Sequence, residues 1–281
     1  FDMLTGMTPN LLHEKIVETL KFFMKSAMKD KAVVGLSGGI DSAVVASVAV
    51  DALGPSSVTA ILLPSPFSTL HSVSDAVELA ENLKIQYYTV PIDGIFHKFQ
   101  RELTDLFGEE PCRLTTENLQ ARIRATILMA FSNQTGALLL NTSNKSELSM
   151  GYGTLYGDLC GAIMVLGDIY KSDVYELAGY LNSLERRIPD SIITKEPSAE
   201  LSVGQKDSDS LPPYPVLDPI LYLLNENGMS PQEIINSGAD SPIVNKIVKM
   251  KDSASFKIAQ LPPVIQIGQH PLLPDSKCIK L

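Results

Sequence analysis

The sequence predicts an α/β protein in which a doubly wound parallel sheet carries helices on both faces, and two observations support this fold class. First, short apolar runs alternate along the chain with longer stretches whose apolar residues recur at helical spacing. Second, most positions of the short runs are apolar and do not alternate strictly with polar residues, which is typical of parallel strands covered on both faces. Helices between such strands form βαβ units.

The first half of the chain contains four predicted strands, at Ala32–Leu36, Val58–Leu63, Ile85–Val90 and Ala137–Leu140. Helices are predicted before and between them, at Leu11–Met28, Ser42–Leu53, Ser74–Leu83, Ile92–Leu106 and Glu117–Ser132. Turn residues such as Gly54-Pro55 separate these elements, and short connections of this kind suit a doubly wound sheet.

The pattern changes after residue 142. A glycine-rich segment at Gly151–Gly167 precedes a predicted helix at Asp173–Leu184 and a polar, proline-punctuated segment. The last part is predicted to form three short helices, at Pro219–Asn225, Pro231–Ser237 and Ile243–Lys251, followed by an extended end at Lys257–Ile267. We expect one domain, residues 1–281, with an α/β core over about 10–215 and a small helical C-terminal part over about 216–281.

Composition and charge disfavour several classes of protein, among them nucleic-acid-binding, membrane and secreted proteins. The 281 residues carry 23 basic and 32 acidic side chains, a net charge of −9, which disfavours binding to nucleic acid. The apolar runs are much shorter than the roughly 20 residues that a membrane span needs, and the first residues do not resemble a signal peptide. Three scattered cysteines favour a reducing compartment. We therefore expect a cytoplasmic protein without a nucleic-acid or membrane partner.

The most specific motif is a glycine turn, Gly35-Leu36-Ser37-Gly38-Gly39-Ile40-Asp41-Ser42, between the first predicted strand and a predicted helix. Glycines let the backbone approach an anion, and the free N–H groups and dipole of the helix attract negative charge. The turn has no lysine and matches neither common phosphate motif. Asp41 would repel a phosphate unless Mg²⁺ bridged the two, so we expect a magnesium nucleotide with basic groups supplied from elsewhere.

A second polar segment, Asn141 to Glu147, follows the fourth predicted strand. Ligands of open α/β sheets bind outside the carboxyl ends of the strands, so this segment could share a crevice with the glycine turn. Asn144 and Glu147 also have the spacing of a capping box, and the spacing alone favours that structural use.

Ser37-Gly-Gly-Ile-Asp-Ser42 resembles the signature of the ATP pyrophosphatases, which cleave ATP between its α- and β-phosphates to adenylate a substrate. Further segments resemble NAD synthetase in the same order, so that the likeness spans nearly the whole chain: Glu117–Arg124, Asn141–Glu147, Gly151–Asp158 and Lys195–Leu201. The chain looks most like the synthetase part of glutamine-dependent enzymes, whose amidase domain has no counterpart in these residues.

The resemblance implies a fold like that of the adenine-nucleotide α-hydrolases and a ligase that forms a C–N bond. Deamido-NAD⁺, ATP and ammonia would give NAD⁺, AMP and pyrophosphate through an acyl adenylate. The family also implies a homodimer, for which the helix Glu117–Ser132 is the candidate boundary. Nitrogen would come from free ammonia or from a separate glutaminase domain or subunit. Another ATP pyrophosphatase amidotransferase and a non-catalytic ATP-binding module are the alternative functions.

The family's motifs also imply roles for individual residues. Asp41 and Lys171 would be catalytic, and Mg²⁺ would bind to Asp41 and Glu147. ATP would contact the glycine turn from Gly35 to Ser42 together with Thr142, Lys171 and Ser198.

Deamido-NAD⁺ would contact Arg122, Glu147 and Lys257. Arg124 lies about 200° further round the predicted helix than Arg122, so the two are not expected at one site. Gly151–Gly167 and Ser202–Pro213 are expected to cover the site and exclude water from the acyl adenylate.

Overall fold

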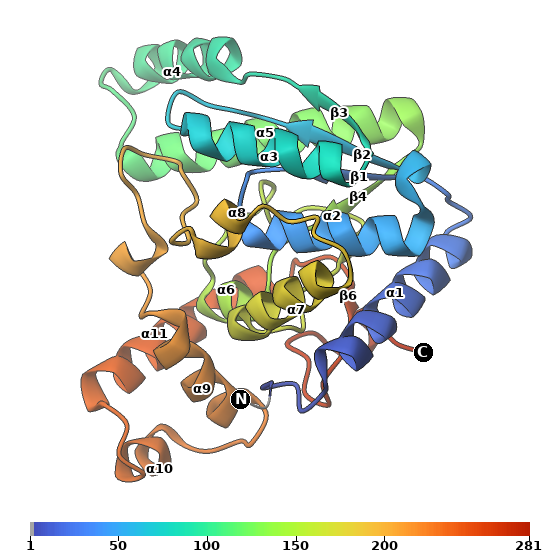
Figure 1. Ribbon diagram of the computed structural model, residues 1–281. Coiled ribbons are helices and arrows are strands. Elements are labelled where there is room, and N and C mark those ends of the chain that lie inside the picture. The colour runs from blue at the N-terminus through green and yellow to red at the C-terminus, as the bar shows by residue number, and fades with distance from the viewer. Residues whose placement is uncertain (1–2) are drawn as a thin grey trace.

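Seven parallel strands form one sheet, which confirms the predicted fold class. The computed structural model describes residues 3–281 (Figure 1). In spatial order the strands are β3 (Gln86–Thr89), β2 (Val58–Leu62), β1 (Ala32–Gly35), β4 (Leu138–Asn141), β5 (Ile163–Met164), β6 (Val264–Ile265) and β7 (Cys278–Ile279). The first four in chain order match the four predicted strands.

Helices connect these strands and cover both faces of the sheet. The helices of the α/β part are α1 (Pro9–Ser26), α2 (Ile40–Leu53), α3 (Leu70–Asn82), α4 (Asp93–Phe107), α5 (Arg113–Thr135), α6 (Lys145–Met150), α7 (Lys171–Leu184) and α8 (Asp190–Thr194). Those of the C-terminal part are α9 (Tyr214–Asn225), α10 (Pro231–Asn236) and α11 (Ser241–Ile258).

Alternate residues of the strands enter two different cores. Val34 of β1 packs in the core formed with α1, α2, α3 and α7, whereas Val33 packs in the core formed with α4 and α5. Leu140 and Leu139 of β4 divide in the same way. Because both faces are covered, every position of these strands except Asn141 at the end of β4 is apolar, which explains the continuous apolar runs in the sequence.

The strand order reverses between β1 and β4. Ala32 of β1 pairs with Val58 of β2 on one side and with Leu138 of β4 on the other. The chain leaves β1 toward one edge of the sheet and leaves β4 toward the other, so the loops that follow these strands part and leave a crevice between them. This reversal is the place at which open α/β sheets bind ligands.

The C-terminal part is mostly helical, and it also extends the sheet. Helices α9, α10 and α11 share a small apolar core, and the chain then returns to add β6 and β7. These two strands and β5 have two residues each. The sequence predicted an extended segment that includes β6, but it predicted neither β5 nor β7.

The expected extended end at Lys257–Ile267 is wrong in its first residues. Helix α11 continues to Ile258, so Lys257 lies in its last turn. Ala254 is buried in that extra length, and the helix ends shortly before Pro262-Pro263, which cannot continue it. Among residues 3–281, the structure contains no helix with the length and apolar character that a membrane crossing requires.

Candidate active site

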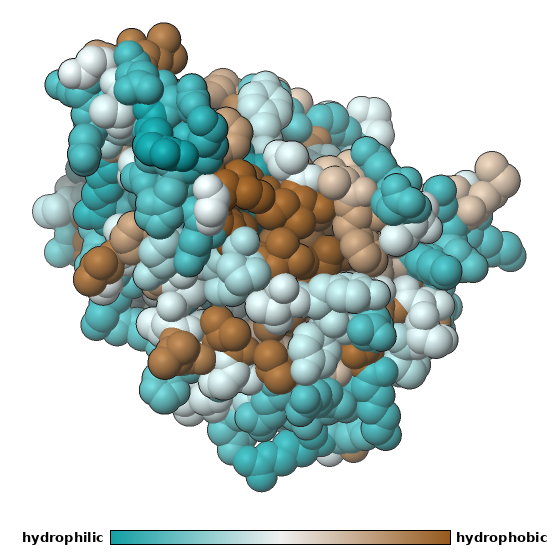
Figure 2. Space-filling view, turned by 90° about the horizontal axis from the view of Figure 1, so that it is seen from above, coloured by the Kyte–Doolittle hydropathy of each residue, from teal (hydrophilic) through white to brown (hydrophobic). Residues whose placement is uncertain are grey.

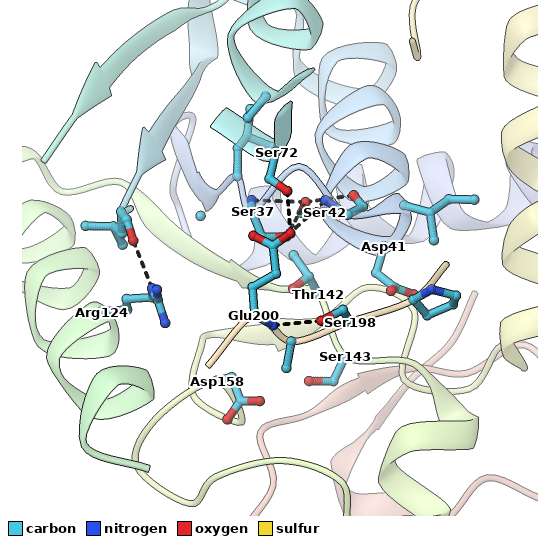
Figure 3. A pocket seen from close by; sticks show the side chains of 18 of the residues that line it. Ser37, Asp41, Ser42, Ser72, Arg124, Thr142, Ser143, Asp158, Ser198 and Glu200 are labelled. Atoms are coloured by element: carbon cyan, nitrogen blue, oxygen red, sulfur yellow. Dashed lines mark hydrogen bonds between the residues drawn. The ribbon is translucent and has the colours of Figure 1, made fainter. Parts of the chain in front are cut away.

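A cavity of about 290 Å³ opens at the reversal point of the sheet. Its walls come from the glycine turn after β1, from the end of β2, from the loop after β4 and from the start of α7. Arg124 of α5, Asp158 of the glycine-rich loop and the segment Lys195–Leu201 close its other sides (Figure 3). The cavity therefore collects residues from distant parts of the sequence around the glycine turn.

Hydrogen bonds between its own serines shape the glycine turn. Ser42 Oγ donates to the carbonyl of Gly39 at 3.0 Å, and the N–H of Gly39 donates to Ser37 Oγ at 3.2 Å. Gly38 has a φ of +78°, and a Cβ built on it would lie 2.2 Å from the carbonyl oxygen of Ser72 in α3. Only glycine fits this position.

Three charged side chains meet beside the glycine turn. Lys171 begins α7, and its ammonium group contacts the carboxylate of Asp41, in the first turn of α2. The same ammonium lies 3.3 Å from Glu147 Oε1, in α6. The side chain of Lys171 is 3% exposed, and those of Asp41 and Glu147 are 17% and 16% exposed.

Burial and mutual charge govern the ionisation of this cluster. Burial raises the pKa of Glu147, the positive charge of Lys171 opposes that rise and favours the carboxylate, and the negative charge of Asp41 acts in the same direction as burial. Burial alone would lower the pKa of Lys171, but Asp41 and Glu147 together raise it above its ordinary value. Lys171 is therefore a permanent buried cation, held in place by carboxylates.

Asn144 links the two acidic residues. Its Nδ2 donates to Asp41 Oδ1 at 2.9 Å, and its Oδ1 accepts from the backbone N–H of Glu147 at 3.0 Å. Glu147 Oε2 accepts in turn from the N–H of Asn144 at 3.4 Å, so the capping box foreseen as a structural alternative is present. Glu147 also faces Lys171 with its other oxygen, and the two uses of the residue coexist.

A third carboxylate, Asp207, lies on the C-terminal side of the cluster. It accepts hydrogen bonds from Tyr152 Oη at 3.1 Å and Tyr214 Oη at 2.9 Å. Burial raises the pKa of Asp207, and Lys171 opposes that rise. The Lys171 ammonium also lies 5.3 Å from the ring centroid of Tyr214, a distance at which a cation and an aromatic ring attract each other.

Two more basic side chains line the cavity. Arg124 donates from Nε to the carbonyl of Leu63 at 2.9 Å, and burial lowers its pKa to about 10. Lys195 lies 2.6 Å from Glu200 Oε1 and contacts Ser72, which itself lies against Gly38. Figure 3 shows Glu200 reaching from its loop toward Ser72 and the glycine turn. The turn thus has cations near it although it contains no lysine.

Most of the residues that the sequence nominated lie together at this cavity. Its lining includes all of the glycine turn except Gly38, together with Thr142, Glu147, Lys171 and Ser198. Arg122 and Lys257 lie outside that lining. Arg122 is exposed and donates to the carbonyl of Leu155 at 3.2 Å. Lys257 donates to the carbonyls of Gly151 and Gly153 at 2.8 and 2.7 Å, so both basic residues hold the glycine-rich loop.

The sequence did not identify several residues of the cavity, and only some of these residues lie in a sequence pattern that could have identified them. Arg124 stands two positions after Arg122, and nothing in the spacing says which of the two faces the sheet. Asp158 lies within a segment that resembles the family, but no role was inferred for it. Asp207 and Glu200 are polar residues in a polar segment, and only the folded chain brings them to the cavity.

The donor atoms in the cavity fit a magnesium ion that arrives with a nucleotide. Among residues 3–281, His, Cys, Asp and Glu side chains form no group of three or more that could hold a metal ion. Asp41 and Glu147 supply two carboxylates. Mg²⁺ is commonly bound by one or two carboxylates together with nucleotide phosphates and water, and seldom by a cage made only of protein groups.

The sheet order and the lysine-free glycine turn define an α/β protein of the PP-loop class. The sequence profile described as NAD synthase matches residues 12–261. The chain is 50% identical over 237 residues to a glutamine-dependent NAD(+) synthetase of Synechocystis sp., and 44% identical over 248 residues to that of Thermotoga maritima. The chain belongs to the NAD synthase family, which confirms the resemblance inferred from the motifs.

The two matches cover 84% and 87% of this chain but 42% and 43% of those relatives. The chain therefore spans less than half the length of the curated relatives that it matches.

Solved structures agree with this family. A structure of NMN synthetase from Francisella tularensis has a TM-score of 0.78 at 31% identity, over 89% of this chain and 96% of that one. An NH3-dependent NAD synthetase from Campylobacter jejuni has a TM-score of 0.74 at 29% identity, over 92% and 100%. A glutamine-dependent NAD+ synthetase from Acinetobacter baumannii, solved with ADP, has a TM-score of 0.65 at 38% identity, over 93% and 47%.

Proposed function

We propose that this chain is a C–N ligase that amidates deamido-NAD⁺ with ammonia and consumes ATP, giving NAD⁺, AMP and pyrophosphate. The observation that carries the proposal is the meeting of Lys171, Asp41 and Glu147 beside a lysine-free glycine turn at the reversal point of the sheet. Membership of the NAD synthase family supports the same reaction.

ATP would bind with its phosphates over the glycine turn. No side chain caps the start of α2, and its backbone N–H groups together with the positive end of the helix dipole favour an anion there. Lys171 would exchange its contact with Asp41 for a phosphate oxygen. The hydroxyl groups of Thr142 and Ser198 line the same cavity. Thr142 can donate to the nucleotide, whereas Ser198 donates its proton to the carbonyl of Gln205 at 2.5 Å and would have to give up that bond to do so.

In the first step the nicotinate carboxylate attacks the α-phosphorus of ATP and pyrophosphate leaves. In the second step ammonia attacks the acyl carbon and AMP leaves. The chain contributes position and charge: Lys171 stabilises the negative charge that grows on the phosphate oxygens, and no side chain forms a covalent bond to the substrate. Asp41 and Glu147 would hold Mg²⁺, which offsets the repulsion between the phosphates and these carboxylates.

Deamido-NAD⁺ would lie across the mouth of the cavity, with Glu147 at its inner end. Arg122 and Lys257 would contact its phosphates from outside the cavity, one from α5 and the other from α11. Both are tied to the loop that begins at Gly151, so binding of the substrate would order that loop over the site. The segments 151–162 and 202–213 would then exclude water from the acyl adenylate. The end of the glycine-rich segment cannot take part, because Ile163 and Met164 form the buried strand β5.

The nitrogen donor is proposed to be ammonia, either free or delivered by a glutaminase domain or subunit. Curated relatives named glutamine-dependent are more than twice as long as the matched part of this chain, and a solved relative of similar length is named NH3-dependent. All three cysteines are free, which supports a cytoplasmic location.

We also propose a homodimer. Figure 2 shows apolar side chains gathered on the face that lies uppermost in Figure 1. Helix α4 buries only Phe96 among its described side chains and exposes Ile95, Phe99 and Leu106, and α5 exposes Met129. A second copy would cover these residues, so the boundary would include α4 as well as α5.

Sedimentation of the purified chain and of its Phe99→Asp variant tests the proposed dimer. The variant should be monomeric, and a monomeric wild type contradicts the dimer.

The reaction is tested by measuring NAD⁺, AMP and pyrophosphate from ATP, Mg²⁺, deamido-NAD⁺ and ammonium. Equal amounts of the three products support the proposal, and folded protein that forms no NAD⁺ above background rejects it. Nicotinate mononucleotide should be tested in parallel, because a relative with 31% identity and 96% coverage is named an NMN synthetase. A larger kcat/KM with the mononucleotide would favour that substrate.

A further inference from the structure

Helix α7, which carries Lys171, has its first turn held by residues of other helices. Its N-cap residue is Tyr170, whose side chain does not cap the helix. Instead the backbone N–H of Lys171 donates to Ser146 Oγ at 2.9 Å, and the N–H of Ser172 donates to Asp218 Oδ2 at 2.8 Å. These N–H groups would otherwise lack partners at the start of the helix.

Asp218 is the centre of this arrangement. It lies in α9 and is 0% exposed. Its Oδ1 accepts from Ser146 Oγ at 2.6 Å, and its Oδ2 accepts from the hydroxyl of Ser172 at 2.7 Å as well as from the N–H. One carboxylate thus joins α6, α7 and α9 through both of its oxygens.

The donor and the acceptor can be assigned in each hydrogen bond that connects Asp218 through Ser146 to Lys171. The hydroxyl of Ser146 has one proton, which it gives to Asp218, so its lone pair is free to accept from the N–H of Lys171. Ser146 is the neighbour of Glu147 in α6, and Ser172 is the neighbour of Lys171 in α7. Movement of Asp218 therefore displaces the backbones that carry both Lys171 and Glu147.

Burying a carboxylate destabilises a fold unless hydrogen bonds or opposite charges compensate for the lost water. An apolar residue at position 218 would pack α9 without that cost. Burial raises the pKa of Asp218, and the hydrogen bonds from Ser146 and Ser172 oppose that rise. Its negative charge also lies at the positive end of the α7 dipole, where it is stabilised. The contacts of Asp218 are thus concentrated on the start of the helix that presents Lys171.

We propose that Asp218 is a positioning residue, which acts through Ser146 and Ser172 to set the place at which Lys171 meets Asp41 and Glu147. The inference rests on the proposed function for its kinetic test, and it extends the site to a residue that lies outside the cavity lining. A displacement of catalytic groups by about 1 Å can reduce a rate by as much as about a hundredfold. The loss should appear in kcat and in the affinity for magnesium ATP, because Lys171 would contact a phosphate oxygen, whereas the KM for deamido-NAD⁺ should stay unchanged.

The test compares Asp218→Asn, Ser146→Ala and the double variant with Asp51→Asn. Asp51 is a partly buried carboxylate outside the cavity lining, with its side chain 18% exposed, and it holds His13 and Arg187 instead. We expect Asp218→Asn to lower kcat by about tenfold or more and Ser146→Ala to lower it less. The double variant should be no slower than Asp218→Asn, because both residues act along one path. Asp51→Asn should lower the unfolding temperature without lowering kcat.

Two outcomes overturn the proposal: a folded Asp218→Asn whose kcat is within about twofold of wild type, or losses in Ser146→Ala and Asp218→Asn that multiply in the double variant. If Asp218→Asn does not fold, the kcat of Ser146→Ala decides between the outcomes. An unchanged kcat in Ser146→Ala contradicts the proposal that Asp218 acts through Ser146. If the wild type makes no NAD⁺, the proposed function fails separately. The affinity for magnesium ATP, measured by calorimetry, then provides the readout: it should fall about tenfold in Asp218→Asn and stay constant in Asp51→Asn, and no fall in Asp218→Asn rejects the inference.

Discussion

The ammonium group of Lys171 contacts the carboxylate of Asp41, although 130 residues separate them in the sequence. One residue begins the helix after β5 and the other begins the helix after β1, so the parallel sheet is what brings them together. Neither residue is held by its partner alone: Asn144 donates to Asp41, and Glu147 lies beside Lys171. These contacts hold the cluster in one arrangement, which reduces the cost of ordering it during the reaction.

Replacing Asp41 by asparagine should reduce turnover by at least about a hundredfold while the fold persists. The amide keeps the shape of the side chain but loses the charge proposed to hold Mg²⁺, and Glu147 still pairs with Lys171. Steady-state pyrophosphate release over a magnesium titration measures the effect. Asp51→Asn is the matched control, because Asp51 lies on the same helix outside the cavity. Unchanged turnover in Asp41→Asn would mean that this carboxylate does not serve the nucleotide.

Gly38→Ala should destabilise the protein far more than Gly108→Ala. Both glycines have positive φ, +78° and +74°, so each substitution costs about 1–2 kcal/mol of backbone strain. Only at Gly38 would the new Cβ also meet backbone, at 2.2 Å from the Ser72 carbonyl oxygen, whereas the space around Gly108 is open within 4 Å. Chemical denaturation gives the two free energies of unfolding. Equal losses would show that the contact between the glycine turn and α3 is unimportant.

Arg122→Met and Arg124→Met should affect different substrates. Arg124 lines the cavity, so its loss should raise the KM for ATP, whereas Arg122 lies outside and should raise the KM for deamido-NAD⁺. Each effect should be about tenfold or more, as is common for a charge that contacts a phosphate. Initial rates with one substrate varied at saturating levels of the other separate the two. An unchanged deamido-NAD⁺ KM in Arg122→Met would remove that residue from the site.

Asp51 should contribute a stability that disappears in acid. Burial would raise its pKa, but hydrogen bonds from His13 and Arg187 outweigh burial and hold the pKa below the ordinary 3.8. A carboxylate whose folded pKa is depressed stabilises the fold above its unfolded pKa and loses that effect as the pH falls through the folded value. Asp51→Asn should therefore cost about 1–3 kcal/mol at about pH 6 and progressively less below 3.8. A cost that is constant down to about pH 3 contradicts this assignment.

The sequence predicted the parts of the fold whose residues repeat a pattern. The strands around Val33 and Leu139 were recognisable because burial on both faces makes every position apolar, and the glycine turn was recognisable because few residues other than glycine fit it. Strands β5 and β7 were missed, and β6 was predicted only as part of an extended segment, because two residues are too few to form a pattern. They exist because neighbouring strands offer a free edge, which is information that lies elsewhere in the chain.

The residues of the candidate site were likewise predictable only where they belong to a recognisable motif. Asp41, Glu147 and Lys171 belong to motifs, and the fold places them together. The capping spacing of Asn144 and Glu147 favours a structural use, and the structure shows that this use does not exclude a functional one. One carboxylate oxygen of Glu147 accepts from Asn144 and the other faces Lys171. The choice between Arg122 and Arg124 needed the direction of α5 across the sheet, and helical spacing does not contain that direction.

The most direct test of the central claim follows an oxygen atom. If the nicotinate carboxylate attacks the α-phosphorus of ATP in this cavity, deamido-NAD⁺ labelled with ¹⁸O in that carboxylate must transfer one label to AMP when ammonia displaces it. Mass spectrometry of the products from wild-type protein should show singly labelled AMP in an amount equal to the NAD⁺ formed, with unlabelled pyrophosphate. Unlabelled AMP, or ADP and phosphate in place of AMP and pyrophosphate, would contradict the account.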